Sequence, residues 1–261
     1  MRVGVLAFRA HEDFPAMIKP WDDPRIFRGM TAQLRHRREL LAVGHKPLGW
    51  KLAFGAPAAM ERLRINAPLV GFLTDRAIVS SGAMLALSGW KKPAAEPELA
   101  VYFGKDVPPG CDRQTAIAAI TALGPAIEVA DVDHASDDVE GTLIRNIYQR
   151  HIIMGLHDAA YAGGMIGDLT ARVLRNGAEI ANAAELQALT GELIDNIRHV
   201  TNLLGAFGEK LRAGQIIITG SIIPPIWVES GEEITFQLEP IDTISIRFAP
   251  LSDAGTIPAG V

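Results

Sequence analysis

Three glutamates are the residues of this chain whose types and spacing could hold a metal ion. Glu96 and Glu98 flank Pro97 at the start of an apolar run, Leu99–Phe103. Residues two apart in an extended chain point to the same side, so both carboxylates can converge on one point. Taken alone, the pair is more typical of two solvated acids at a strand end.

Glu128 favours a metal site over two solvated acids, because it lies within a short apolar strand, Ile127–Ala130. Burial of an unpaired carboxylate is costly, so this side chain requires a cation or a strong hydrogen-bond partner. Three carboxylates without His or Cys at ligand spacing suit a hard ion, Mg²⁺ or Mn²⁺, and disfavour zinc. Asp131 and Asp133 follow with the opposite strand phase, and we interpret this rival pair as loop acids.

Composition narrows the class of protein further. A net charge of −5 over 261 residues provides no broad positive field for nucleic acid, and the basic run Arg35-His36-Arg37-Arg38 is interpreted as a solvated helix face. The single Cys111 excludes an internal disulfide and, in its Pro-Pro-Gly turn, is typical of an inert thiol. Without a signal-peptide pattern or an apolar stretch of about 18 residues, we expect a cytoplasmic protein with no membrane span.

Helices that help position these residues are predicted from caps and periodicity. Asp23 as N-cap and Pro24 at the first helical position predict an amphipathic helix that ends near Gly44. Its apolar stripe comprises Phe27, Met30, Leu34 and Leu41. Further helices are predicted at Asp112–Leu123 and at about Glu192–Leu204.

Short apolar or alternating runs between Gly and Pro predict strands. They are Gly49–Phe54, Glu98–Phe103, Ile127–Ala130, Ile216–Thr219, Ile234–Leu238 and Ile244–Phe248. Asn176-Gly177 predicts a type I′ hairpin turn between Ala171–Arg175 and Ala178–Ala181, because that turn requires positive φ at both central residues. Since strands and helices do not alternate regularly, the sequence favours an α+β fold with a mostly antiparallel or mixed sheet.

Four blocks of the chain follow one another in a specific order. They are Gly49-Trp50-Lys51, Glu96-Pro97-Glu98-Leu99-Ala100, Pro125-Ala126-Ile127-Glu128-Val129 and Gly214-Gln215-Ile216-Ile217-Ile218-Thr219-Gly220-Ser221. In order and spacing they resemble the fumarylacetoacetate hydrolase superfamily, and within it the 2-oxopent-4-enoate hydratase and 4-oxalocrotonate decarboxylase family. The resemblance runs from about Asp23 to Phe248. It implies a β-rich, mixed-sheet roll with a helical N-terminal part.

The expected organisation is an N-terminal arm and helix, residues 1–60, followed by a β-rich catalytic domain, residues 61–261. Within the arm, residues 1–22 show no clear period, and we assign them no role.

The resemblance also implies the ligand and the site. A small 2-oxo acid would be bound by a divalent metal, Mg²⁺ or Mn²⁺, on the three glutamates, and processed by a lyase of aromatic meta-cleavage catabolism. Lys51 matches the family's active-site lysine; without the resemblance, a solvated strand-edge lysine is an equal interpretation. Thr219 and Ser221 match a turn that holds a carboxylate, although such a tripeptide is by itself an ordinary turn.

Departures from the family pattern bear on the reaction. Leu69 occupies a substrate-site position where the hydratases carry an acid and the decarboxylases are apolar, so it favours decarboxylation. Asp75 is a possible substitute acid but is more typical of a turn residue. Asn146 matches the family, whereas the bulkier Tyr148, Gln149 and Arg150 follow it. Arg150 is interpreted either as a surface arginine or as a reader of a second substrate carboxylate.

Two alternative functions remain open. One is hydrolysis of an acylpyruvate or another β-diketone, which requires a base to activate water; His45 is the histidine near the Lys51 block. The other is a catalytically weak, metal-binding partner subunit, because hydratase and decarboxylase chains of the family associate with one another. We expect a homo-oligomer, either alone or associated with such a paralogue. The helix that starts at Asp23 is expected to pack on its own sheet rather than on another subunit.

Overall fold

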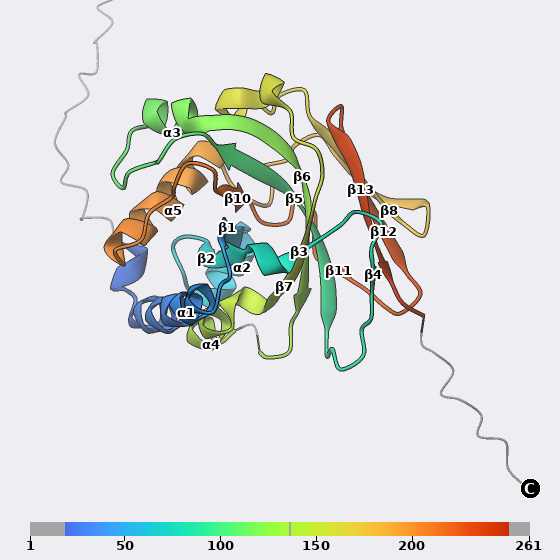
Figure 1. The fold of residues 1–261 in the computed structure, drawn as a ribbon, viewed down its shortest axis with the longest axis horizontal. Coiled ribbons are helices and arrows are strands. Elements are labelled where there is room, and N and C mark those ends of the chain that lie inside the picture. Colours follow the sequence, from blue (N-terminus) through green and yellow to red (C-terminus); the bar gives the residue numbers. More distant parts are fainter. Residues whose placement is uncertain (1–18, 136, 251–261) are drawn as a thin grey trace, which may run out of the picture.

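The computed structural model describes residues 19–135 and 137–250 (Figure 1). The helices are α1 (Pro24–Ala42), α2 (Pro57–Leu63), α3 (Arg113–Ala119), α4 (Val139–Ile144) and α5 (Leu193–Ala206). Short 3₁₀ segments are η1 (Pro20–Asp22), η2 (Asp75–Ala77), η3 (Asn146–Tyr148) and η4 (Ala159–Gly164). Residues 1–18, most of the arm without an assigned role, lie outside the described residues.

The strands form two sheets. They are β1 (Pro47–Ala53), β2 (Leu69–Thr74), β3 (Ile78–Val79), β4 (Met84–Leu85), β5 (Pro93–Phe103), β6 (Ile120–Asp131), β7 (Gln149–Met154), β8 (Thr170–Arg175), β9 (Ala178–Ala183), β10 (Ile216–Ile218), β11 (Ile226–Trp227), β12 (Glu233–Glu239) and β13 (Asp242–Phe248). The larger sheet has the order β2-β1-β10-β5-β6-β7-β3, with β11 paired to β5, and the smaller has the order β4-β13-β12-β8-β9.

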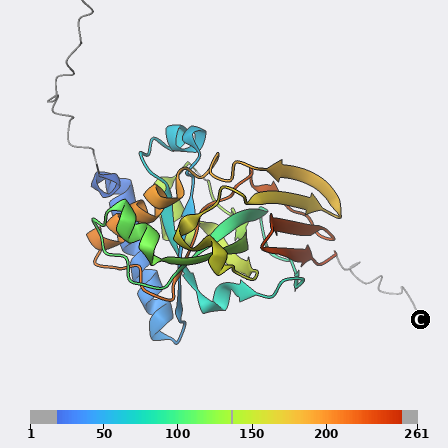
Figure 2. The ribbon, with the colours of Figure 1, turned by 90° about the horizontal axis from the view of Figure 1, so that it is seen from above.

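The predicted α+β class with a mixed, mostly antiparallel sheet is confirmed. Strand pairs β1–β10, β3–β7 and β4–β13 are parallel, and the other pairs are antiparallel. Helices α1, α4 and α5 gather on one side of the larger sheet, and the smaller sheet forms the opposite side (Figures 1 and 2). None of the helices in the described part of the chain is long and apolar enough to cross a membrane.

β5 and β6 are the long central strands, of 11 and 12 residues. β6 begins at Ile120, where the predicted helix was expected to continue to Leu123. That prediction was wrong: α3 ends at Ala119, and Leu123 pairs with Val101 of β5. An alanine-rich helical pattern carries no information about a partner strand, and the ladder with β5 overrides the local preference.

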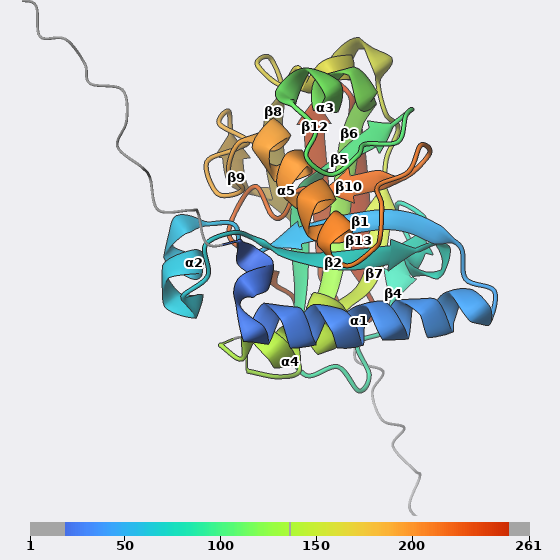
Figure 3. The same cartoon turned by 90° about the vertical axis from the view of Figure 1, so that its left-hand side faces the viewer.

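α1 begins and packs largely as predicted. The Asp23 carboxylate accepts a hydrogen bond from the Arg25 N–H (2.8 Å), and the helix ends two residues before Gly44. Gln33 Nε2 donates to the carbonyls of Val70 (3.2 Å) and Leu143 (3.0 Å), so α1 packs on its own chain, alongside α4 (Figure 3).

Two predictions on α1 were wrong. Phe27 is 54% exposed, because the buried face is centred on Ile26, Met30 and Leu34. Arg37 of the basic run is buried: its guanidinium lies 4.8 Å from the ring centroid of Trp50 and pairs with Glu209 (3.0 Å). A polar side chain that can pair with a distant acid is not recognisable from helical spacing alone.

The predicted hairpin is confirmed. Asn176 (φ 52°) and Gly177 (φ 80°) connect β8 to β9, and Arg175 pairs with Ala178. The division at residue 60 stays a prediction, although β1, from the first segment, is hydrogen-bonded within the larger sheet between β2 and β10.

Candidate metal centre and substrate cavity

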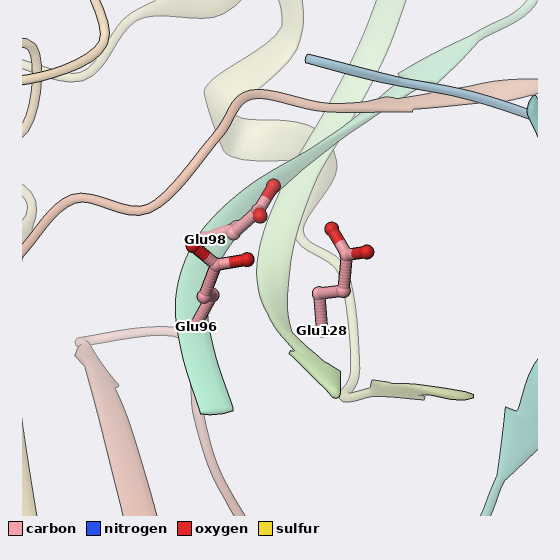
Figure 4. A group of neighbouring side chains, drawn as sticks. All are labelled: Glu96, Glu98 and Glu128. Carbon is pink, nitrogen blue, oxygen red and sulfur yellow. The ribbon is translucent and has the colours of Figure 1, made fainter. Parts of the chain in front are cut away.

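The register of β5 and β6 places the three glutamates together. Glu96 lies directly opposite Glu128 in the ladder, and Glu98, two residues along β5, shares the same face. One carboxylate oxygen from each of the three lies within 4.8 Å of the others (Figure 4). Like charges opposite each other destabilise a sheet, so this arrangement requires a cation.

Lys51 provides part of that charge. Its buried ammonium donates hydrogen bonds to Glu128 Oε1 and to the carbonyl of Ile147 (3.2 Å). Glu128 Oε2 has no hydrogen-bond partner within the described residues. One lysine therefore faces three carboxylates, and a buried oxygen remains without a donor.

The pKa values express this excess of negative charge. Burial, together with the neighbouring Glu128, raises the pKa of Glu96 to about 7 and that of Glu98 well above its ordinary value. Burial also raises the pKa of Glu128, while Lys51 acts in the opposite direction. A buried set of oxygen donors that resists ionisation without a cation fits a hard divalent ion, and this fit comes from the residues themselves.

Room for Lys51 is provided by Gly71, its partner in the β1–β2 pair. A Cβ at Gly71 would lie 2.9 Å from both Lys51 Cγ and Asn146 Oδ1, too close for a real contact. Asn146 in turn holds β2, because its side chain accepts from the Phe72 N–H (2.8 Å) and donates to the Phe72 carbonyl (2.9 Å). Gly71 thus leaves space for the lysine side chain, and Asn146 fixes the strand that carries Gly71.

The η3 segment is a left-handed turn that the sequence did not reveal. Asn146, Ile147 and Tyr148 all have positive φ (50°, 53° and 62°), a region that non-glycine residues rarely occupy. The turn directs the Ile147 carbonyl to Lys51. A β-branched and an aromatic residue in this conformation have no sequence signature, because the surrounding tertiary structure imposes it.

The Thr219–Ser221 turn follows β10 and supports Glu98. The Gly220 N–H donates to Glu98 Oε2 (2.7 Å), so this N–H is engaged by a protein carboxylate. Thr219 Oγ1 lies 3.4 Å from the Leu99 nitrogen, and Ser221 Oγ donates weakly to the Pro97 carbonyl (3.5 Å). The two hydroxyls remain beside the acids, where they can contact a bound molecule.

A cavity of about 610 Å³ opens over this group. Glu96, Glu98, Thr219 and Ser221 line it, and its walls are largely apolar. Lys51, Glu128 and Leu69 do not line it in this structure. Lys51 and Glu128 are fully buried, with Glu128 beside the lining acids. Leu69 is 2% exposed and pairs with the lining residue Ala53 from the neighbouring strand.

The structure places other candidate residues away from the cavity. His45 Nδ1 lies 3.2 Å from Thr74 Oγ1, and the Asp75 carboxylate accepts from the Lys46 N–H (2.9 Å). Arg150 faces Asp131 (3.6 Å) and Asp133 (3.8 Å) in a separate cavity of about 200 Å³.

Asp131, interpreted from the sequence as a loop acid, is instead the buried last residue of β6. Its Oδ1 accepts from the N–H groups of Lys91 (3.0 Å) and Lys92 (2.8 Å) and so ties down the start of β5. The interpretation was wrong because β6 extends beyond the apolar run from which its end was judged.

The raised pKa of Glu96 predicts a pH-dependent difference between wild type and Glu96→Gln. With chelator present, the free carboxyl loses its proton near pH 4.5 when unfolded but only near pH 7 when folded. Its contribution to stability therefore falls as pH rises through this window. Urea unfolding should show the variant more stable than wild type by about 3 kcal/mol at pH 8, and by well under 1 kcal/mol at pH 4.5.

The exposed Glu185→Gln variant is the matched control and should show no such trend. A difference between Glu96→Gln and wild type that does not change between pH 4.5 and 8 would show that Glu96 ionises normally.

Comparisons with known proteins agree with this architecture. Residues 48–249 match the family described as Fumarylacetoacetate (FAA) hydrolase C-terminal. A 4-oxalocrotonate decarboxylase from Pseudomonas sp. (strain CF600) is 27% identical over 241 residues, 90% of each chain. A 2-hydroxyhexa-2,4-dienoate hydratase from Comamonas testosteroni is 27% identical over 212 residues, 79% of this chain and 80% of the hydratase.

A solved structure provides the same fold. The 4-oxalocrotonate decarboxylase from Pseudomonas putida G7, complexed with magnesium and adipate, superposes with a TM-score of 0.79 at 26% identity and covers 88% of this chain and 89% of that chain. The resemblance predicted from the four sequence blocks is confirmed. Because the family match spans most of the described residues, the chain belongs to the fumarylacetoacetate hydrolase family.

Proposed function

We propose that this chain is a lyase that acts on a small 2-oxo acid and depends on Mg²⁺ or Mn²⁺ held by Glu96, Glu98 and Glu128. The observation that supports the proposal is the convergence of these three carboxylates beneath a largely apolar cavity, with Lys51 as their one ion-pair partner in the described structure. A bound divalent ion supplies Lewis acidity toward the carboxylate and ketone oxygens of such an acid.

The residues around the acids have distinct tasks in this proposal. The Gly220 N–H fixes one oxygen of Glu98, and Lys51 offsets the charge of Glu128. The Thr219 and Ser221 hydroxyls, which line the cavity, are placed to donate to the substrate carboxylate. Apolar walls limit water, which strengthens the electrostatic interactions within the cavity.

Among the possible reactions, we favour decarboxylation of a 2-oxo-enedioate in aromatic meta-cleavage catabolism. Among the described residues that line the 610 Å³ cavity, Glu96 and Glu98 are the only carboxylates, and there is no histidine that could activate water. Hydration and β-diketone hydrolysis both require such a group, whereas loss of CO₂ requires mainly an electron sink. The relative complexed with adipate, a six-carbon diacid, supports a substrate with two carboxylates.

The test is to incubate the protein with Mg²⁺ and a panel of 2-oxo-enoates and 2-oxo-enedioates while CO₂ release and enone absorbance are followed. We expect CO₂ release from an enedioate that is abolished by chelator and restored by Mg²⁺ or Mn²⁺. Turnover that is indifferent to chelator would exclude the metal-dependent proposal, and two carboxylic acids released from an acylpyruvate would indicate a hydrolase.

Hydrogen exchange into pyruvate distinguishes a lyase from a catalytically weak partner subunit. An active metal site should promote exchange of the pyruvate methyl protons for solvent deuterium. If Mg²⁺ binds but this exchange and all panel reactions are undetectable, the chain is such a subunit rather than a lyase.

A further inference from the structure

The cavity lining carries two cationic side chains in addition to the acids. Arg62 of α2 and Lys92, directly before β5, both line the cavity and are both exposed. Neither side chain has an ion-pair partner within residues 19–135 and 137–250. The cavity therefore presents buried negative charge at its base and free positive charge at its exposed rim.

Lys92 is placed by strand phase. Two-residue spacing relates Lys92, directly before β5, to Ala94, Glu96 and Glu98 on the strand, and all four line the cavity. The Val132 N–H donates to the Lys92 carbonyl (3.0 Å), so the extended pairing with β6 continues through Lys92. Residues with this spacing share one face of a strand. Lys92 thus lies on the same face as the metal-site acids, and the lining residue between them, Ala94, has a small side chain.

The ammonium of Lys92 is held in a defined position. Its Nζ lies 4.0 Å from the ring centroid of Trp227, which is itself a lining residue on β11, opposite Ala94. The Lys92 N–H also donates to the buried Asp131. A lysine with an anchored backbone and an aromatic contact loses less conformational entropy on binding a ligand than a free surface lysine.

The distance suits a diacid of moderate length. Lys92 and Glu96 are four residue steps apart, about 13 Å along an extended backbone. A chain of five single bonds extends about 6 Å, which describes both a six-carbon acid and a lysine side chain. The Lys92 ammonium lies against Trp227, which pairs with Ala94, midway between Lys92 and Glu96. A six-carbon acid held at Glu96 and Glu98 can therefore extend along the strand to the ammonium with its far end.

We infer that Lys92 recognises the second carboxylate of a dianionic substrate and so selects 2-oxo diacids over 2-oxo monoacids. The inference rests on the proposed function, because it takes the first carboxylate to be held at the metal-site acids. Arg150 does not have this role, because it is paired with Asp131 in the separate cavity of about 200 Å³. Lys92 is also favoured over Arg62, because Arg62 lies on the separate helix α2, whereas Lys92 directly precedes the strand that carries Glu96 and Glu98.

The test compares 2-oxoadipate with 2-oxohexanoate, saturated acids of equal length that differ by one carboxylate. Binding to the full-length protein with Mg²⁺ is measured by calorimetry for wild type and for Lys92→Gln, Lys92→Arg, Arg62→Gln and Lys91→Gln. Lys91 is the matched control, because it is an adjacent exposed lysine that does not line the cavity.

We expect Lys92→Gln to weaken 2-oxoadipate binding about tenfold and 2-oxohexanoate binding less than twofold. Lys92→Arg should retain most of the diacid preference, and Lys91→Gln should retain all of it. The inference is overturned if Lys92→Gln weakens both acids equally or neither, or if only Arg62→Gln removes the preference. If wild type with Mg²⁺ binds neither acid, the proposed function itself fails.

Discussion

Replacement of Glu98 by glutamine is expected to lower the affinity of the protein for Mg²⁺ by at least about 100-fold, with a comparable loss of turnover. Removing an outer-shell partner of a metal ligand costs roughly 10–100-fold, and removing the ligand itself costs at least as much. Glu98 is 1% exposed, and one of its oxygens accepts the Gly220 N–H. The amide preserves the shape of the side chain but removes its charge.

Calorimetric titration with Mg²⁺ measures this effect directly. Asp133→Asn is the matched control, because Asp133 belongs to the rival acidic pair and lies in the separate cavity with Arg145 and Arg150. Asp133→Asn should bind Mg²⁺ with the same affinity as wild type. If Asp133→Asn loses Mg²⁺ binding while Glu98→Gln keeps it, the metal site is the rival pair.

Substitution of Lys51 by methionine should have the largest effect on stability. In the metal-free protein, Lys51 and Glu128 form a fully buried ion pair. Removal of one partner leaves a buried carboxylate without a cation, which typically costs about 3–5 kcal/mol of unfolding free energy. Urea unfolding with chelator present measures this loss, and the exposed Lys46→Met variant should show little change.

A double variant separates the buried ion pair from simple loss of packing. Lys51→Met combined with Glu128→Gln removes both charges, so most of the lost stability should return. Glu128→Gln also removes a proposed metal ligand, and the double variant should therefore fail to bind Mg²⁺ tightly despite its recovered stability. If the double variant is no more stable than Lys51→Met, the loss arises from packing rather than from an unpaired charge.

Much of the local structure was predictable because its causes are local. The Asp23 cap and the Asn176-Gly177 turn depend on the conformations that a few adjacent residues can adopt, and both are confirmed. The spacing of Glu96 and Glu98 placed both on one face because side chains alternate along any strand. The helix predicted through Leu123 failed where a distant strand, β5, determined the outcome.

The site was predictable in its residue types but not in its arrangement. Lys92 has the same phase as Glu96, yet it was missed because the predicted strand began at Glu98 rather than at Pro93. The left-handed turn at Asn146–Tyr148 was missed because non-glycine residues adopt it only under tertiary constraint. Leu69 matches a substrate-site position of the family, yet in the structure it is buried and does not line the cavity.

By itself, the sequence determined that Glu96 and Glu98 project together and that Glu128 requires a partner, because strand alternation and the cost of a buried charge follow from local chemistry. Only the tertiary structure decided that Glu128 stands opposite Glu96 and that Lys51 lies against it. Strand register and pairing arise from packing between segments far apart in the chain, and local spacing does not encode them.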